Sequence, residues 1–134
     1  MFLAKYDTQG NFLWAQQIVS QGGYGSANTD LAIDTNGNIY VGGTYSTLVH
    51  FRNIAVPSPA SHSHFLAKYT AQGQLTWVRP VLGSGMSTLA YGYSFVRVAV
   101  TASNEVYLLS KFRVAVTLNA TTTLPSNTKP YGIR

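Results

Sequence analysis

Three histidines, His50, His62 and His64, are the side chains most capable of binding a metal. Imidazole is a good ligand for zinc and copper, and residues two apart on a strand point the same way. However, prolines and serines lie just before and between His62 and His64, which indicates that these two histidines are in a loop. A metal site needs three or four convergent ligands, and no cysteine or nearby carboxylate completes one. We therefore expect no metal and no cofactor.

The acidic residues offer little more chemistry, since the chain has only four Asp and Glu. The spacing Asp34-x-Asn36-x-Asn38 resembles the start of a calcium loop. Its glycine is at the fourth position instead of the sixth, and no glutamate stands at the twelfth. A hairpin turn explains these polar residues more simply. No pair of carboxylates and no nucleophile beside a base stands out, so we expect no enzyme.

The chain repeats itself, which points to the elements that hold these residues. Residues 2–14 read FLAKYDTQGNFLW and residues 65–77 read FLAKYTAQGQLTW, an offset of 63 residues. Residues 31–41 (LAIDTNGNIYV) return at 98–108 (VAVTASNEVYL), an offset of 67. Self-similarity at such a period indicates a repeat architecture.

Each repeated segment is two short apolar runs joined by a five-residue turn. The turns begin with Asp or Thr, and their fourth residues are Gly10, Gly37, Gly73 and Asn104. Gly and Asn accept a positive φ angle at low cost, and a leading Asp bonds the backbone two residues on. This predicts hairpins at 2–18, 30–45 and 65–81, and a degenerate one at 96–112. The expected strands are 2–6, 12–18, 30–34, 38–45, 65–69, 75–79, 96–100 and 105–112, with extra pairing near 47–56 and 114–120.

Several predicted strands have no polar position, as in Phe2-Leu3-Ala4 and Leu31-Ala32-Ile33. A sheet with one wet face would alternate, so these strands are covered on both faces. The pattern FLAKYD-x-x-G-N-x-L-W followed by A-I-D-x-x-G-N-I-Y-V-x-G resembles the SBBP repeat of bacterial β-propellers. The resemblance implies antiparallel four-stranded blades built from repeated hairpins, usually in larger secreted or surface proteins, and no catalytic residue. We expect an all-β chain whose residues 1–134 form one partial β-propeller domain.

The charge and the lengths of the apolar runs exclude two classes of binding partner. Charged residues are 10% of the chain and the net charge is +5, but the basic residues are scattered. Binding a phosphate backbone needs a contiguous basic stripe, so we expect no nucleic acid. No apolar run has the length of a membrane span, so we expect no membrane insertion. No signal peptide is visible, and an extracellular or cell-surface location is implied by the resemblance alone.

Two glycine-rich segments lie at matching points of the two units, Gly22–Ser26 and Gly83–Gly85. The first lacks the lysine of a phosphate-binding loop, and both fit crossovers between blades. Loops at a propeller face carry binding, so the ligand candidates are three loop tyrosines, Tyr24, Tyr91 and Tyr93. The equivalent tryptophans Trp14 and Trp77 are expected to be packing residues.

The first functional hypothesis is a structural or interaction module, a segment of a propeller scaffold from a larger bacterial protein. A second is a carbohydrate-binding propeller that uses the loop tyrosines. A weaker third is a propeller hydrolase whose catalytic residues lie outside this chain.

The tail at 121–134 ends in Tyr131-Gly-Ile-Arg134, which has the aromatic–x–apolar–basic order of Phe65-Leu-Ala-Lys68 and lies 66 residues later. It leads into a next repeat. The expected partners are therefore the remaining blades of a longer chain, or further copies of this chain by self-association.

Gly, Pro or β-branched residues interrupt every candidate helix of about ten residues. We therefore predict a far-UV circular dichroism spectrum of β type. A clear helical double minimum would contradict the all-β assignment.

Overall fold

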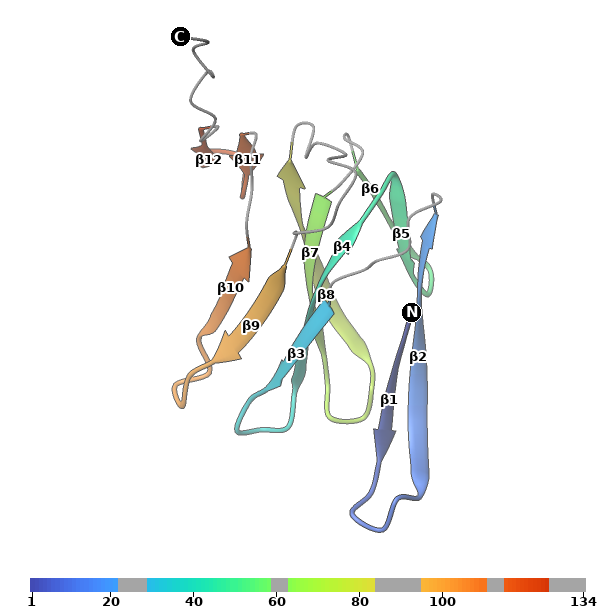
Figure 1. Ribbon diagram of the computed structural model, residues 1–134. Helices are drawn as coiled ribbons and strands as arrows, with labels where there is room; N and C mark the ends of the chain where they lie inside the picture. The colour runs from blue at the N-terminus through green and yellow to red at the C-terminus, as the bar shows by residue number, and fades with distance from the viewer. Residues whose placement is uncertain (22–28, 59–62, 84–94, 111–114, 126–134) are drawn as a thin grey trace, which may run out of the picture.

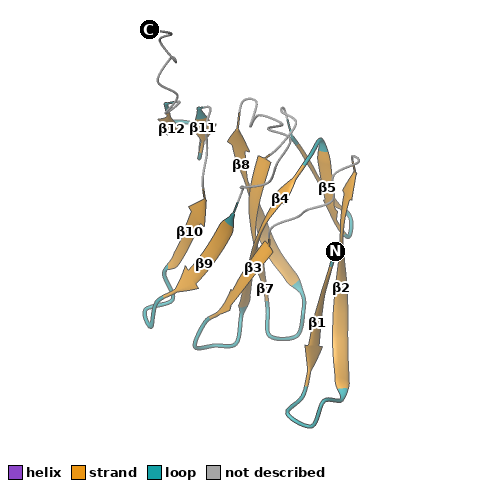
Figure 2. Cartoon of the chain, in the orientation of Figure 1, coloured by secondary structure: helices purple, strands orange, loops and turns teal. Residues whose placement is uncertain are grey.

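The computed structural model describes residues 1–21, 29–58, 63–83, 95–110 and 115–125. These residues form antiparallel strands and, within those ranges, no helix (Figures 1 and 2). The strands are β1 (Phe2–Tyr6), β2 (Phe12–Gln21), β3 (Thr29–Ile33), β4 (Ile39–Tyr45), β5 (Leu48–Phe51), β6 (Ile54–Pro57), β7 (Ser63–Tyr69), β8 (Leu75–Gly83), β9 (Val96–Val100), β10 (Val106–Ser110), β11 (Val116–Thr117) and β12 (Thr123–Leu124). The eight strands expected from the repeats are present, with ends shifted by a few residues.

The four predicted turns have one geometry. Gly10, Gly37, Gly73 and Asn104 have φ angles of 85°, 78°, 80° and 66°. In each turn the first residue and the fifth are joined by a backbone hydrogen bond, as between the Asp34 amide and the Asn38 carbonyl at 2.9 Å. The Asn104 turn is as regular as the others, because asparagine tolerates the left-handed conformation that glycine supplies elsewhere.

The repeat extends to strand register. In the β1–β2 hairpin Lys5 faces Trp14 and the register then shifts by one residue before Tyr6. In β7–β8 Lys68 faces Trp77, with the same shift before Tyr69. The β3–β4 and β9–β10 hairpins also match each other pair for pair. Sequence similarity between the units therefore reports equivalent positions in three dimensions.

The prediction of four-stranded blades was wrong for the middle of the molecule. The described strands form a first sheet in the order β1-β2-β5-β6, a central sheet in the order β12-β11-β8-β7-β4-β3, and a third sheet of β9 and β10. The central sheet has six strands because β4 pairs with β7 and a short third hairpin, β11–β12, pairs with β8. The equivalent hairpin of the first unit, β5–β6, pairs with β2 in the first sheet. The sheets that the described residues form do not close into a ring.

The chain alternates between sheets as it proceeds. Hairpin β1–β2 starts the first sheet, β3–β4 starts the central sheet, and β5–β6 returns to the first. The second unit does the same one sheet further on, since β7–β8 joins the central sheet, β9–β10 starts the third, and β11–β12 returns. Neighbouring sheets are thus held together by the covalent chain as well as by packing (Figure 1).

Apolar clusters fill the spaces between sheets, and β4 contributes to both through alternate residues. Between the first and central sheets the cluster includes Val41 and Tyr45 of β4, with Ile18, Phe51 and Phe65. Burial there raises the pKa of Tyr45 to about 12, against a smaller lowering by Ser63. Between the central and third sheets the cluster holds Tyr40, Val96 and Val98, with Trp77, Leu66 and Leu108 against it. Both faces of β4 are buried. The prediction of cover on both faces was wrong for Phe2–Ala4 and Leu31–Ile33, where Phe2, Leu31 and Ile33 are 74%, 49% and 59% exposed. In the described part of the chain no strand packs over that side of these two segments.

The carboxylate of Asp34 holds its own turn together. It accepts hydrogen bonds from the backbone amides of Asn36 and Asn38 at 2.9 and 2.8 Å, and from the Asn38 side chain at 2.8 Å. Burial of Asp34 raises the pKa of its carboxyl, but these hydrogen bonds, with Asn38 first, outweigh that effect and leave the pKa below its usual 3.8. In the exposed turn at Asp7, the side chain of Asn11 is the main cause of the same lowering of the pKa.

A carboxyl whose pKa is lowered on folding stabilises the fold above its unfolded pKa, and that contribution disappears as pH falls through the folded pKa. We predict that the melting temperature falls as pH drops below about 4. An Asp7→Asn, Asp34→Asn double variant keeps one side-chain oxygen to accept the backbone N–H bonds of each turn but has no carboxyl to protonate. Its melting temperature should therefore fall less steeply with decreasing pH. Thermal melts in a series of acidic buffers measure this, and equal slopes for the two proteins would contradict it.

Candidate interaction site

The structure describes only some of the sequence-predicted site residues, so the ligand candidates stay predictions. Tyr24, Tyr91, Tyr93 and His62 lie outside the described residues. His50 is half-buried on β5 of the first sheet, whereas His64 is buried on β7 of the central sheet with its Nε2 2.8 Å from Ser110 Oγ. Among the described residues no three His, Cys, Asp or Glu side chains group as metal ligands would.

Asp34, Asn36 and Asn38 form hydrogen bonds with one another within the turn, as the hairpin interpretation predicted. Asp34 also accepts a hydrogen bond from the Tyr40 hydroxyl at 3.3 Å. Its two oxygens therefore serve the hairpin and the strand that follows it.

Trp14 and Trp77 are half-buried packing residues, and Trp14 links two sheets. Its indole N–H donates to the Ala71 carbonyl at 3.3 Å, and the Lys5 ammonium donates to the same oxygen at 3.1 Å. A Cβ built on Gly73 would lie 2.7 Å from the Trp14 ring. The turn of the central sheet thus seats directly on an aromatic ring of the first sheet, and only glycine fits there.

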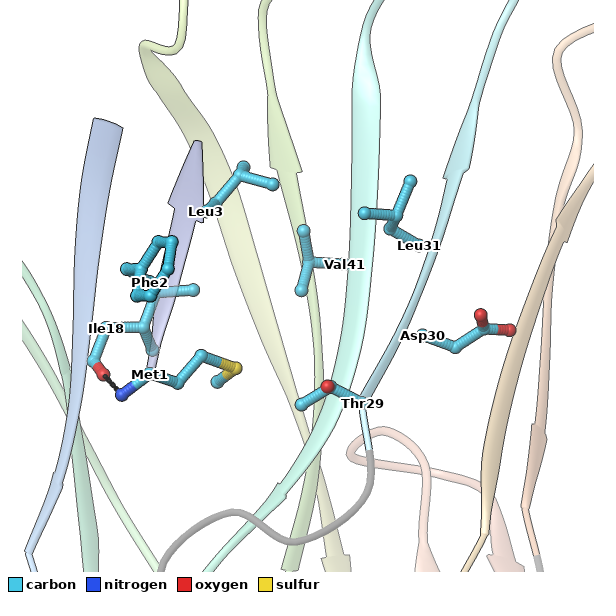
Figure 3. Close-up of a pocket in the computed structure, with 8 residues that line it drawn as sticks. All are labelled: Met1, Phe2, Leu3, Ile18, Thr29, Asp30, Leu31 and Val41. Atoms are coloured by element: carbon cyan, nitrogen blue, oxygen red, sulfur yellow. Dashed lines mark hydrogen bonds between the residues drawn. The ribbon is translucent and has the colours of Figure 1, made fainter. Parts of the chain in front are cut away.

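A partly open pocket of about 240 Å³ lies between the first and central sheets. Figure 3 shows β1 on one side of it and β3 and β4 on the other. It is lined by Met1, Phe2, Leu3, Ile18, Thr29, Asp30, Leu31 and Val41. Most of this lining is apolar, so the pocket suits an apolar side chain and not a charged group.

The pocket lies in the larger open surface of the molecule. Leu31 and Ile33 of β3 are 49% and 59% exposed on the side facing the first sheet. Within the described residues β1 pairs only with β2, so its other edge is open beside the pocket. An open strand edge next to apolar surface is the arrangement that binds another strand. We call this surface, formed by the β1 edge, Leu31, Ile33 and the pocket, the open face.

The sequence predicted extra pairing near 47–56 and 114–120, and the structure has a third hairpin there in each unit, β5–β6 and β11–β12. The sequence signal for these hairpins is weak: Leu48–Phe51 and Ala115–Leu118 share only the valines Val49 and Val116, and a Pro-Ser pair lies at the end of each hairpin. Two residues of pairing in β11 produce too short a run to stand out by periodicity.

Comparison with known proteins supports the repeat architecture. The chain is 26% identical over 121 residues to a WD repeat-containing protein of Acanthamoeba polyphaga mimivirus. The similarity covers 81% of this chain and 8% of that protein, so the chain spans under a tenth of the length of its relative. No family model matches the chain, and no solved structure matches it.

The repeated hairpins and antiparallel sheets make this an all-β repeat protein, and the similarity to a WD repeat-containing protein is consistent with a β-propeller-like architecture. The SBBP type and a bacterial origin stay predictions, because no family model carries them. Among the described residues there is no helix of the length and apolar character needed to cross a membrane.

The contact between Trp14 and Gly73 yields a matched test. Gly10 is equivalent to Gly73, has a similar φ, and has nothing within 4 Å of its built Cβ. We predict that in the monomeric chain, at a protein concentration too low for association, Gly10→Ala lowers the free energy of unfolding by about 1–2 kcal/mol through backbone strain alone. Gly73→Ala should cost more, because the strain adds to a clash with the ring.

Chemical denaturation of both variants measures the difference, and a Trp14→Ala background isolates the clash. If Gly73→Ala costs no more than Gly10→Ala, the seating of the turn on Trp14 is wrong.

Proposed function

We propose that this chain is a protein-interaction module of a β-propeller-like scaffold, and that its open face binds an extended polypeptide segment. The observation that carries the proposal is the pairing of an open strand edge with an apolar pocket immediately beside it. The backbone of a bound segment would hydrogen-bond to β1, and alternate side chains would enter the pocket.

The similarity to a WD repeat-containing protein supports an interaction role for this chain. So does the distribution of charge, since the open face is built mainly from Phe2, Leu3, Leu31, Ile33 and Val41. Such a surface gains affinity by burying apolar area, at roughly 25 cal/mol per Å² before the cost of ordering. A location on a bacterial surface or outside the cell belongs to this proposal only through the resemblance of the repeat sequence.

The lectin alternative rests on Tyr24, Tyr91 and Tyr93, which lie outside the described residues. It stays a prediction, and the same experiment tests it.

We predict that a displayed library of extended peptides yields binders with alternating apolar residues. Leu31→Lys should weaken them about tenfold to a hundredfold, since burying a leucine contributes about 1.5–3 kcal/mol. Ile54→Lys is the matched control, because Ile54 is 46% exposed but lies on β6 at the far edge of the first sheet. Dissociation constants for both variants, with a glycan array in parallel, measure this. Glycan binding without peptide binding, unaffected by Leu31→Lys, would contradict the proposal.

A further inference from the structure

We propose that the segment bound by the open face is β10 of a second copy of this chain, docked head to tail. The inference rests on the proposed function and names its partner. The copy that presents β10 is the donor copy, and the copy that presents β1 is the acceptor copy.

The chain already contains this joint once. Strand β4 pairs with β7 over seven residue pairs, from Ile39 with Tyr69 to Tyr45 with Ser63. Strand β10 is equivalent to β4, and β1 is equivalent to β7, by the repeat and by hairpin register. The joint between copies therefore has a defined register: Val106 faces Tyr6, Tyr107 faces Lys5, Leu108 faces Ala4, Leu109 faces Leu3, and Ser110 faces Phe2.

The sheet orders are complementary. The third sheet supplies β9 and β10, and the first supplies β1, β2, β5 and β6. Joined through β10 and β1, they give the order β9-β10-β1-β2-β5-β6. Position for position this is the order of the central sheet, β3-β4-β7-β8-β11-β12. Within the described residues β10 pairs only with β9, so among these residues its other edge is open. Tyr131–Arg134, which the repeat aligns with the start of β7, lie outside the described residues.

Leu109 fits the pocket. The equivalent residue in β4 is Gly42, whose built Cβ would lie 2.7 Å from Val96 and Val98 and 3.0 Å from Leu108. The positions equivalent to these three neighbours are Thr29, Leu31 and Val41, and all three line the pocket. Where the internal joint is crowded and has glycine, the open joint has a cavity and a leucine that is 60% exposed.

Tyr107 has ready-made partners as well. Its equivalent, Tyr40, is 3% exposed, lies under the Lys68 ammonium at 5.1 Å from the ring centroid, and is 6.1 Å from the Trp77 ring centroid. Tyr107 is 59% exposed in this chain. In the joint it would lie beside Lys5 and Trp14 of the acceptor copy, which are the equivalents of Lys68 and Trp77.

The hairpin turns that contain Gly10 and Gly73 also support the joint between copies. Trp14 covers Gly73 of the next sheet, whereas nothing approaches the equivalent Gly10 within 4 Å. Docking would place Trp77 of the donor copy over Gly10 of the acceptor copy. One internal contact has no counterpart: Asp30 accepts a hydrogen bond from the Val98 amide at 2.9 Å, and Arg97 stands at the equivalent position. Apolar contacts and strand pairing therefore carry the joint.

The joint uses different surfaces on the two copies, so it is heterologous and generates rings or open filaments. Each joint completes one sheet beside the central sheet of each copy. A propeller of about four to eight blades would need on the order of two to four copies.

Sedimentation velocity across a range of concentrations tests self-association directly. The wild-type chain should form discrete oligomers or longer assemblies. Leu109→Lys in the donor strand and Leu31→Lys in the acceptor face should each give monomers with an unchanged circular dichroism spectrum, and Ile54→Lys should assemble as wild type. If Leu109→Lys does not fold, Tyr107→Lys replaces it. A wild-type chain that is monomeric at every concentration overturns the inference.

Mixing the two monomeric variants tests the polarity of the joint. The Leu31→Lys chain keeps an intact β10, and the Leu109→Lys chain keeps an intact open face. One good joint remains, so an equimolar mixture should form dimers and nothing larger. A mixture that stays monomeric overturns the head-to-tail arrangement.

A disulfide trap tests the register, because the chain has no cysteine of its own. Tyr107→Cys with Lys5→Cys should cross-link between copies on mild oxidation, since directly opposed residues have Cβ atoms about 4.5–5.5 Å apart. Tyr107→Cys with Leu13→Cys is the control and should not cross-link. Equal cross-linking of both pairs would contradict the register. A wild-type chain that is monomeric but still binds displayed peptides would overturn self-docking alone. A wild-type chain that neither associates nor binds displayed peptides would overturn the proposed function too.

Discussion

The pairing of β4 with β7 is the interaction on which the rest of the molecule depends. It joins the middle hairpin of the first unit to the first hairpin of the second over seven residue pairs. Without it β3–β4 would be an isolated two-stranded hairpin, which is marginally stable at best in water, and the strands β7-β8-β11-β12 of the second unit would form a separate sheet. With it, the central sheet gains strands on both sides and an apolar cluster on each face.

That joint constrains which residues the strands use. Gly42 and Gly43 lie in the middle of β4, where side chains from the third sheet and from Phe65 approach closely. A glycine in a strand interior weakens the strand, and it is tolerated here because close approach of the sheets is worth more. The second unit has Leu109 at the position of Gly42, and this leucine is 60% exposed, because no described sheet packs against that face. Ser110, at the position of Gly43, faces the central sheet with its Oγ 2.8 Å from His64 Nε2.

Much of this fold could be predicted from the sequence because its strongest signals are local. The hairpin turns depend on four or five neighbouring residues, and Gly10, Gly37, Gly73 and Asn104 all have the positive φ that their residue types favour. The return of β5–β6 to the first sheet could not be predicted in this way. It depends on pairing between Ile18–Gln21 and Leu48–Phe51, which no local pattern reports. Self-association was expected from the sequence, but the position of the open face was not, because the exposure of a strand edge depends on which distant strands pair. The tyrosine candidates came from loop position alone, and they fall outside the described residues.

The interleaved path of the chain also explains why the molecule has both stability and open surface. Each unit advances by one sheet while returning once, so the central sheet takes strands from both units and is filled, whereas the first and third sheets receive only some of their strands. Exposed apolar residues follow from this among the described residues: Leu31 and Ile33 face the first sheet on the side where β1 is its last described strand, and Tyr107 and Leu109 lie on the outer face of the third sheet. These two surfaces are related by the offset of the repeat, so each has the chemistry that the other lacks. A repeat that packs against its neighbour inside one chain therefore carries, on its outermost sheets, the two halves of the same contact.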